Sequence, residues 1–214
     1  MFWVMGESLV RKMPLQARSR RRVDAILQAT VKLMLELGYE ATTTASIAAE
    51  AGVPIGSLYQ FFDNKEAILE TLAQRYATDM LALRAQLFPA DMNQMPLPDL
   101  VNRTADKLVT FMDEHRGFNH LFGSVWGSPE IAAASERMRT DMIEGIMGVI
   151  TGRASGLAQA EVMLAAKTLL HMIQGILPLV EAGVGYAREG AVRELKRAWL
   201  AYLTAVIKAA PRTQ

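Results

Sequence analysis

The sequence of 214 residues contains no cysteine. This absence excludes disulfide bonds and thiolate chemistry, and it suits the reducing environment of the cytoplasm. Runs of strand length that alternate apolar and polar residues hardly occur either, whereas Ala, Leu, Met, Glu and Arg are abundant. Because such a composition favours helices, we expect an all-α protein. The formal net charge is +1, so the total charge does not indicate a partner.

An uninterrupted apolar run of membrane-spanning length is also missing. The longest apolar stretch, residues 162–184, is interrupted by Lys167, His171, Gln174, Pro178 and Glu181. We therefore expect a buried helix of a soluble protein rather than a membrane span. The N-terminal MFWVM is apolar, but it lacks the basic region and the length of a secretory signal. Together these observations predict a cytoplasmic protein that does not contact a membrane.

Motifs of enzymes and metal sites are scarce. The sequence has no GxSxG nucleophile elbow, no HExxH pair and no phosphate-binding loop. The three histidines, His115, His120 and His171, lack the i, i+4 spacing of a helical metal site. We therefore expect no catalytic residues, no cofactor and no metal ion, so an enzyme is the least favoured class of function.

Helical periodicity and stop signals predict the first helices. Apolar residues recur at helical spacing over residues 22–37, and Gly38 is a typical helix stop. The threonines at 42–44 supply N-cap hydroxyls for a second helix that stops at Gly52, and Pro54 suits the first position of a third. Two short helices with a glycine in the turn between them are typical of a helix-turn-helix.

The remaining chain predicts further helices, which makes about nine in total. They are expected at about 63–87, 98–114, 118–125, 128–153, 159–182 and 190–209. We divide the chain into a flexible basic arm at residues 1–18, a helix-turn-helix domain at 19–66 and a helical bundle at 67–214.

Positive charge and hydroxyl groups gather near the predicted helix-turn-helix. The cations of residues 11–22, with no acid among them, are Arg11, Lys12, Arg18, Arg20, Arg21 and Arg22. Such a run is either a solvated tail or an arm that binds phosphates. The hydroxyls of Thr43 and Thr44, at the start of a helix, predict another phosphate-binding element.

The third predicted helix begins with small residues and is followed by aromatic ones. Gly56 costs about 1 kcal/mol of helix propensity relative to alanine, but Gly56 and Ser57 let the backbone come close to bases and phosphates. Tyr59 lies on the same side as Ile55 and Gly56, and its hydroxyl can reach a phosphate, as can Lys65. The alternatives are a packed aromatic residue for Tyr59 and a solvated surface lysine for Lys65.

The stretch GYEATTTASIAAEAGVPIGSLYQFFDNKEAIL, residues 38–69, resembles the DNA-binding signature of the TetR-type family of transcriptional regulators. The resemblance covers residues 20–72. The matching positions are Gly38, Tyr39, Thr42, Thr43, Ile47, Ala48, Ala51, Gly52, Val53, Gly56, Leu58, Tyr59, Phe62, Lys65 and Glu66. Two positions depart from the pattern: Pro54 stands where a capping serine is common, and Phe61 stands where a histidine is common.

The resemblance implies a homodimer with one helix-turn-helix per subunit and a C-terminal domain, here residues 67–214, that dimerises and binds a small effector. It also implies a repressor that leaves a palindromic DNA operator when the effector binds. Carried over by position, it implies phosphate contacts for Thr44, Tyr59 and Lys65. The residues that it places toward the bases are Pro54, Ile55, Gly56, Ser57 and Gln60.

The last two predicted helices are apolar over more than one stripe, which indicates burial on most sides. A four-helix interface with a second copy of the chain explains this excess of apolar residues, and the core of a monomer is the alternative. The residues predicted in the dimer interface are Leu169, Ile173, Ile176, Trp199 and Leu203.

An effector pocket is expected inside the C-terminal bundle. The predicted lining residues are Phe111, His115, Phe118, Phe122, Trp126, Met142, His171 and Met172. Such a lining suits a largely apolar small molecule, although aromatic and Met residues at helical spacing also occur as plain core. His171, in an apolar run, is alternatively a core histidine with its hydrogen bonds satisfied.

The sequence therefore predicts a DNA-binding transcriptional regulator. The alternative is a helical small-molecule-binding or adaptor protein without a role on DNA. The third helix argues against this alternative, because an adaptor does not need a recognition helix that contains a glycine.

Overall fold

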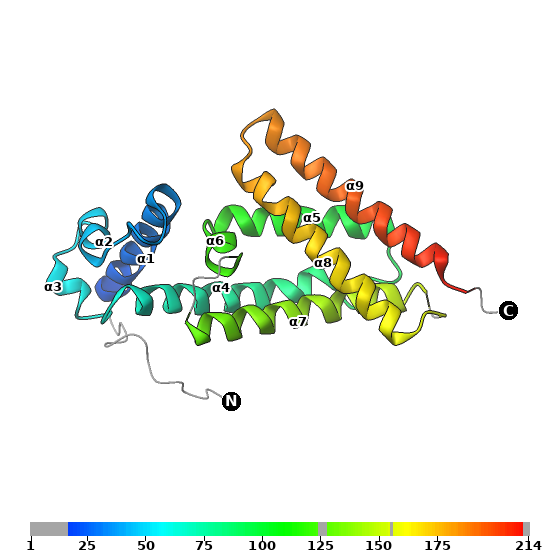
Figure 1. The fold of residues 1–214 in the computed structure, drawn as a ribbon, viewed down its shortest axis with the longest axis horizontal. Helices are drawn as coiled ribbons and strands as arrows, with labels where there is room; N and C mark the ends of the chain where they lie inside the picture. Colours follow the sequence, from blue (N-terminus) through cyan, green and yellow to red (C-terminus); the bar gives the residue numbers. More distant parts are fainter. Residues whose placement is uncertain (1–16, 124–127, 155, 212–214) are drawn as a thin grey trace. The chain divides into compact units, whose positions relative to one another are not determined.

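The structure is a computed structural model that describes residues 17–123, 128–154 and 156–211. Within these residues the chain forms nine helices and no strand (Figure 1). The helices are α1 (Ala17–Leu37), α2 (Thr44–Glu50), α3 (Ile55–Leu58), α4 (Lys65–Leu87), α5 (Leu97–Glu114), α6 (Phe118–Gly123), α7 (Pro129–Thr151), α8 (Gln159–Ala182) and α9 (Tyr186–Ala209). The all-α prediction is confirmed, whereas most of the predicted arm, residues 1–16, lies outside the described residues.

The described chain divides into two compact units. The first contains residues 17–77 and 116–134, and the second contains residues 78–115 and 135–211. The structure thus places the boundary within α4 and not after residue 66, and it assigns α6 to the first unit. The physical reason is that Leu121 and Ile131, remote in sequence, join the hydrophobic core of the first unit.

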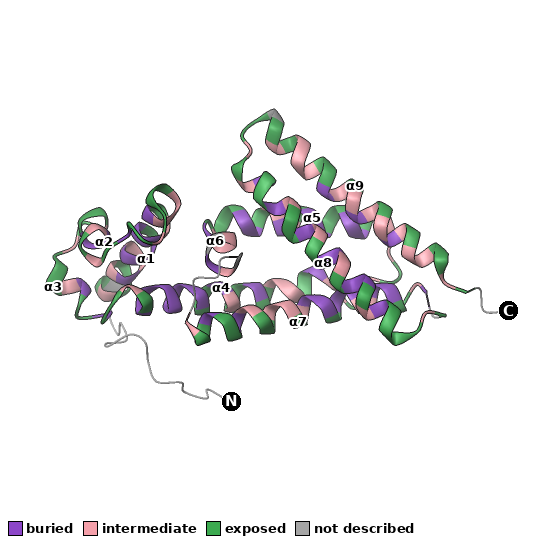
Figure 2. Cartoon of the chain, viewed as in Figure 1, coloured by how far each residue is buried: buried purple, intermediate pink, exposed green. Residues whose placement is uncertain are grey.

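The core of the first unit holds the helix-turn-helix, α2 and α3, against α1 and the start of α4. Ile26, Ile47, Leu58, Phe62 and Ile68 are all 0% exposed. Burial of each such side chain contributes about 1.5–3 kcal/mol relative to exposure. Figure 2 shows the buried positions on α1 and on the beginning of α4. Leu58 therefore anchors the short α3, and its burial determines which side of α3 remains exposed.

Two glycines with positive φ form the turns on either side of α2. Gly38 has a φ of 80° and Gly52 a φ of 64°, a left-handed conformation that costs other residues about 1–2 kcal/mol. The Thr42 hydroxyl donates to the Gly38 carbonyl at 2.8 Å and fixes the first of these turns. Both predicted helix stops are confirmed. Pro54, however, is the N-cap residue of α3 and not its first helical residue.

In the second unit, α9 packs along α8 and against α5. Four of the residues predicted in a dimer interface, Leu169, Ile173, Trp199 and Leu203, are at most 4% exposed within the single chain. The chain itself covers these four side chains, so the structure places them in its core, where they offer little surface to a second copy. Ile176 is partly exposed and stays a predicted interface residue.

Among the described residues, α8 is the helix with the length and hydropathy of a membrane span. The core helix of a soluble protein meets the same criterion. Residues such as Val162, Leu169, Ile173 and Val180 are buried along one side of α8. The sequence predicted burial on most sides, but Leu164 and Leu179 of this helix are 67% and 62% exposed in the single chain.

The segment after α4 packs closely on α7. A Cβ atom on Gly145 would lie 2.6 Å from ring carbon Cζ of Phe88, so this ring needs a glycine beneath it. We expect Gly145→Ala to lower the free energy of unfolding by about 1–3 kcal/mol, because the ring must move within a packed interior. Gly190→Ala on α9 is the matched control, since the nearest atom to a Cβ there is 3.8 Å away. Equal urea midpoints for the two variants would contradict this packing.

Candidate nucleic-acid interface

The residues predicted to face DNA bases lie on the outer side of α3. Ile55 is a large apolar residue with 44% of its surface exposed, beside the buried Leu58. A Cβ atom on Gly56 would meet no atom within 4 Å. The exposed or partly exposed set is Pro54, Ile55, Gly56, Ser57 and Gln60. This side of α3 is therefore open to a partner surface.

The aromatic residues after α3 divide between core and surface. Phe61 and Phe62 are 3% and 0% exposed and belong to the core, whereas Tyr59 is 42% exposed. The structure thus excludes a packed role for Tyr59. Phe61, at the position where a phosphate-binding histidine is common, anchors the end of the helix-turn-helix instead.

Two predicted phosphate contacts meet at the surface. The Thr44 hydroxyl, in the first turn of α2, lies 3.0 Å from the Tyr59 hydroxyl at the C-cap of α3. This hydrogen bond joins the two helices of the helix-turn-helix. A hydroxyl pair of this kind can offer an O–H group to a phosphate oxygen.

Thr43 has a structural role at the start of α2. Its hydroxyl accepts a hydrogen bond from the Ser46 backbone N–H at 3.1 Å, and the Ser46 hydroxyl accepts one from the Thr43 N–H at 3.0 Å. This reciprocal cap satisfies two backbone donors at the end of the helix. The Thr43 side chain is therefore engaged in the cap, whereas the Thr44 side chain faces Tyr59. At the start of α4, Asn64 accepts from the Ala67 N–H at 2.8 Å and is the cap.

Lys65 is held in place by Tyr39. Its Nζ atom donates to the Tyr39 carbonyl oxygen at 2.8 Å and lies 3.7 Å from the centroid of the Tyr39 ring. A cation over an aromatic face contributes about 0.5–1 kcal/mol at an exposed site. Lys65 is partly buried, so the structure corrects the alternative of a freely solvated lysine.

The hydroxyl of Tyr39 extends this cluster to the next residue of α4. It donates to Glu66 Oε1 at 2.9 Å. Burial, with help from the Glu66 carboxylate, raises the pKa of Tyr39 to about 12. The phenol therefore stays protonated, and remains a hydrogen-bond donor, throughout the physiological pH range. Tyr39 is one of the positions that match the TetR-type signature in the sequence. Its contacts with α4, however, are visible only in the structure.

The cations Arg20, Arg21 and Arg22 lie near the start of α1. This helix begins at Ala17, earlier than residue 22, where the apolar periodicity placed its start. Arg20 and Arg21 are exposed and Arg22 is partly exposed. The first turn of α1 contains no acidic residue. These three arginines remain predicted phosphate contacts, while Arg11 and Lys12 lie outside the described residues.

The residues predicted to line an effector pocket are distributed over the chain. Phe118 and Phe122 pack in the first unit, with ring centroids 4.8 Å apart. Met142 is buried on α7 and Met172 is partly buried on α8, whereas Trp126 lies outside the described residues. His171 is exposed on α8, which corrects both its predicted place in a pocket and the alternative of a core histidine.

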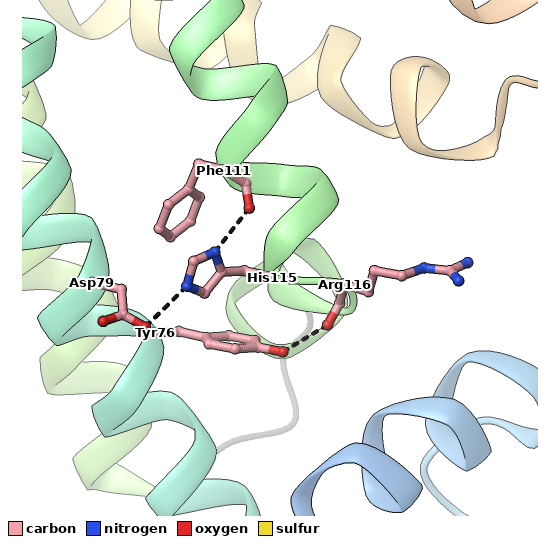
Figure 3. A network of polar contacts seen from close by, with 5 residues as sticks. All are labelled: Tyr76, Asp79, Phe111, His115 and Arg116. Carbon is pink, nitrogen blue, oxygen red and sulfur yellow. Dashed lines mark hydrogen bonds and ion pairs between the residues drawn. The ribbon is translucent and has the colours of Figure 1, made fainter. Parts of the chain in front are cut away.

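His115 closes the end of α5 in the second unit (Figure 3). Its ring stacks on Phe111 at 3.9 Å, its Nδ1 lies 2.9 Å from the Phe111 carbonyl oxygen, and its Nε2 lies 2.9 Å from Asp79 Oδ2. Both ring nitrogens therefore have partners within the chain, which indicates a structural role in joining α5 to α4. Figure 3 also shows Tyr76, in the first unit, donating to the Arg116 carbonyl at 2.8 Å.

A small apolar cavity lies in the second unit, among residues of α4, α5, α7 and α9. Its volume of about 10 Å³ is room for about one water molecule. An effector of any larger size requires these helices to move apart. The lining residues are Leu87, Phe88, Leu100, Val101, Thr104, Ile146, Val149, Trp199 and Leu203. Sequence reasoning missed this cavity and placed Trp199 and Leu203 in an interface.

Two protein-family models match the chain. The model for bacterial regulatory proteins of the tetR family matches residues 26–72, which include the helix-turn-helix. The model for the tetracyclin repressor-like C-terminal domain matches residues 96–203, half of the chain. The two matched segments together contain α2 to α8, most of α1, and α9 as far as Leu203, apart from the part of α4 after Leu72.

Curated relatives are similar over shorter segments. The HTH-type transcriptional repressor KstR2 of Rhodococcus jostii (strain RHA1) is 36% identical over 140 residues, which are 62% of this chain and 65% of that protein. The HTH-type transcriptional repressor ComR of Escherichia coli (strain K12) is 36% identical over 77 residues, 34% of this chain and 37% of that protein. The chain thus spans less than two thirds of the length of these relatives.

Solved structures share the fold at low sequence identity. The TetR family transcriptional regulator PfmR from Thermus thermophilus has a TM-score of 0.64 at 21% identity, with 87% of this chain and 99% of that chain covered. A regulatory protein of the tetR family from Rhodococcus RHA1 has a TM-score of 0.60 at 21% identity, with 90% and 98% covered. With both family models matched and the helix-turn-helix in place, the chain belongs to the tetR family of bacterial regulatory proteins.

Proposed function

We propose that this chain is a transcriptional repressor that binds a palindromic DNA operator as a homodimer and leaves it when a small, largely apolar effector binds. The observation that carries the proposal is the open side of α3 at residues 54–60, flanked by the Thr44–Tyr59 hydroxyl pair and by Lys65. A helix with small residues suits close approach in the major groove, and hydroxyls and cations beside it suit the phosphates. Such a repressor acts in the cytoplasm, where its operator lies.

Substitutions at the proposed phosphate contacts test this surface. We expect Tyr59→Phe and Lys65→Ala to weaken binding to specific and non-specific duplexes alike, because phosphate contacts carry no base information. Lys65→Ala is also expected to reduce the slope of log K against log salt by about 1 for each subunit. Fluorescence anisotropy over a salt series measures both effects, with exposed Lys208 of α9 replaced by alanine as the control. A loss of affinity that depends on a single base pair, with an unchanged salt slope, contradicts the phosphate role.

The proposed dimer uses the exposed side of α8. Leu164 and Leu179 are 67% and 62% exposed, and His171 and Gly175 lie between them at helical spacing. A Cβ atom on Gly175 would meet nothing within 4 Å, so another helix can approach the backbone closely here. A second copy related by a two-fold axis covers the same apolar surface on both subunits. Figure 2 shows exposed positions along α8.

The small cavity in the second unit supports an effector of apolar character. Its lining is apolar apart from Thr104, whose hydroxyl donates to the Leu87 carbonyl at 3.3 Å. Ligands that enlarge such a cavity displace packed side chains and gain mainly from apolar contact. An apolar effector is therefore expected to raise the melting temperature and to lower affinity for the operator.

A helical small-molecule-binding or adaptor protein without a role on DNA is the second candidate, favoured by the apolar surface of α8. An electrophoretic shift with genomic fragments separates the two functions. A shift of only some of the fragments at physiological salt supports the repressor. The absence of any shift, even at low salt, supports the adaptor.

A further inference from the structure

Lys65 and Glu66 are consecutive residues of opposite charge at the start of α4, and both contact Tyr39 in the turn after α1. Lys65 Nζ binds the Tyr39 carbonyl at 2.8 Å and lies over the ring, whereas the Tyr39 hydroxyl donates to Glu66 Oε1 at 2.9 Å. One tyrosine thus holds the cation with its ring face and carbonyl and the anion with its hydroxyl. These contacts span 26 and 27 positions of the sequence.

This arrangement matters because the two charges have opposite effects at a phosphate surface. A carboxylate that pairs with Lys65 offsets its positive charge, and this attraction is stronger at a protein surface than in bulk water. Such a pair removes the positive charge that a phosphate needs. Glu66 is exposed, so without a partner its carboxylate is also able to repel the DNA backbone. The hydroxyl of Tyr39 gives this carboxylate a partner other than Lys65.

We propose that Tyr39 is a positioning residue for DNA binding: its ring and carbonyl hold Lys65 for a phosphate, and its hydroxyl keeps the Glu66 carboxylate away from Lys65. Tyr39 acts through Lys65 and Glu66 and not through contact with the DNA itself. The inference rests on the proposed function, in which the phosphate backbone of an operator is the ligand of Lys65.

A double-mutant cycle on the full-length protein tests the role of the hydroxyl. The variants are Tyr39→Phe, Glu66→Gln and the two combined, each measured by anisotropy with a duplex selected by the wild-type protein. Tyr39→Phe keeps the ring face and the carbonyl and removes the hydroxyl that holds Glu66. We expect Tyr39→Phe to bind about 5- to 10-fold more weakly at low salt, with a salt slope smaller by up to about 1 for each subunit. Glu66→Gln is expected to bind at least as tightly as the wild type.

The combined variant gives the decisive comparison. We expect it to bind as tightly as Glu66→Gln alone, because without the carboxylate there is no charge for the hydroxyl to hold. The inference is overturned if Tyr39→Phe binds like the wild type, or if the combined variant loses as much affinity as Tyr39→Phe. A lowered melting temperature with an unchanged salt slope also overturns it, since that pattern indicates a purely structural tyrosine. Failure of the wild type to bind any duplex instead refutes the proposed function.

Discussion

The Gly56→Ala variant is expected to bind its operator about 100-fold more weakly than the wild type while its fold stays intact. A Cβ atom at this position meets nothing within 4 Å in the free chain, and Gly56 is not among the glycines with positive φ. Alanine is therefore tolerated, and its helix propensity exceeds that of glycine by about 1 kcal/mol. On DNA, however, the added methyl group keeps α3 away from the bases in both half-sites. Such overpacking costs about 1–3 kcal/mol at each contact.

The informative result is the contrast between stability and binding. We expect a melting temperature equal to or above that of the wild type, together with a large loss of operator affinity. This result would indicate that α3 is the surface that lies close to the DNA bases. Gly190→Ala on α9 is the matched helical glycine in the second unit and is expected to leave affinity unchanged. Wild-type affinity for the Gly56→Ala variant contradicts the assignment.

Replacing Leu179 by glutamate is expected to convert the proposed dimer into folded monomers. Leu179 is 62% exposed in the single chain, so a charge there is solvated in the monomer and buried without a partner in the proposed interface. An unpaired buried charge costs about 3–5 kcal/mol, which raises the dimer dissociation constant by about 100-fold or more. Sedimentation velocity across protein concentrations measures the change. The affinity for an operator with two half-sites is expected to fall as the dimer dissociates.

Two other positions, Leu81 and Ile173, serve as controls for this experiment. Leu81 on α4 is 60% exposed and lies outside the proposed interface, so Leu81→Glu is expected to remain dimeric. Ile173 is 3% exposed in the core of the chain, and Ile173→Glu is expected to unfold or aggregate rather than to give a folded monomer. A Leu179→Glu variant that stays dimeric moves the interface away from this side of α8.

Local signals in the sequence predicted the helix-turn-helix well, because its turns depend on single residues. Gly38 and Gly52 end helices through a left-handed backbone that few other residues adopt. The start of α1 was placed too late, since arginines favour helix but add nothing to the apolar periodicity that marks one. The open side of α3 followed from the same local pattern of small and aromatic residues.

Contacts between segments that are far apart in the sequence could not be predicted from the sequence. Apolar residues on more than one side of α8 indicate burial, but periodicity does not distinguish the core of one chain from an interface between two. Leu169 and Ile173 were therefore placed in the dimer interface, although the single chain covers them. The contacts of Tyr39 were missed for the same reason, because its partners Lys65 and Glu66 are far from it in the sequence.

We propose that two copies of this chain read DNA through α3. Selection of bound sequences from a library of random duplexes by the full-length protein tests it most directly. We expect enrichment of an inverted repeat with half-site centres about 34–36 Å apart along the duplex, or a multiple of that distance. Recovery of no enriched sequence, or of single half-sites without a symmetric partner, would contradict it.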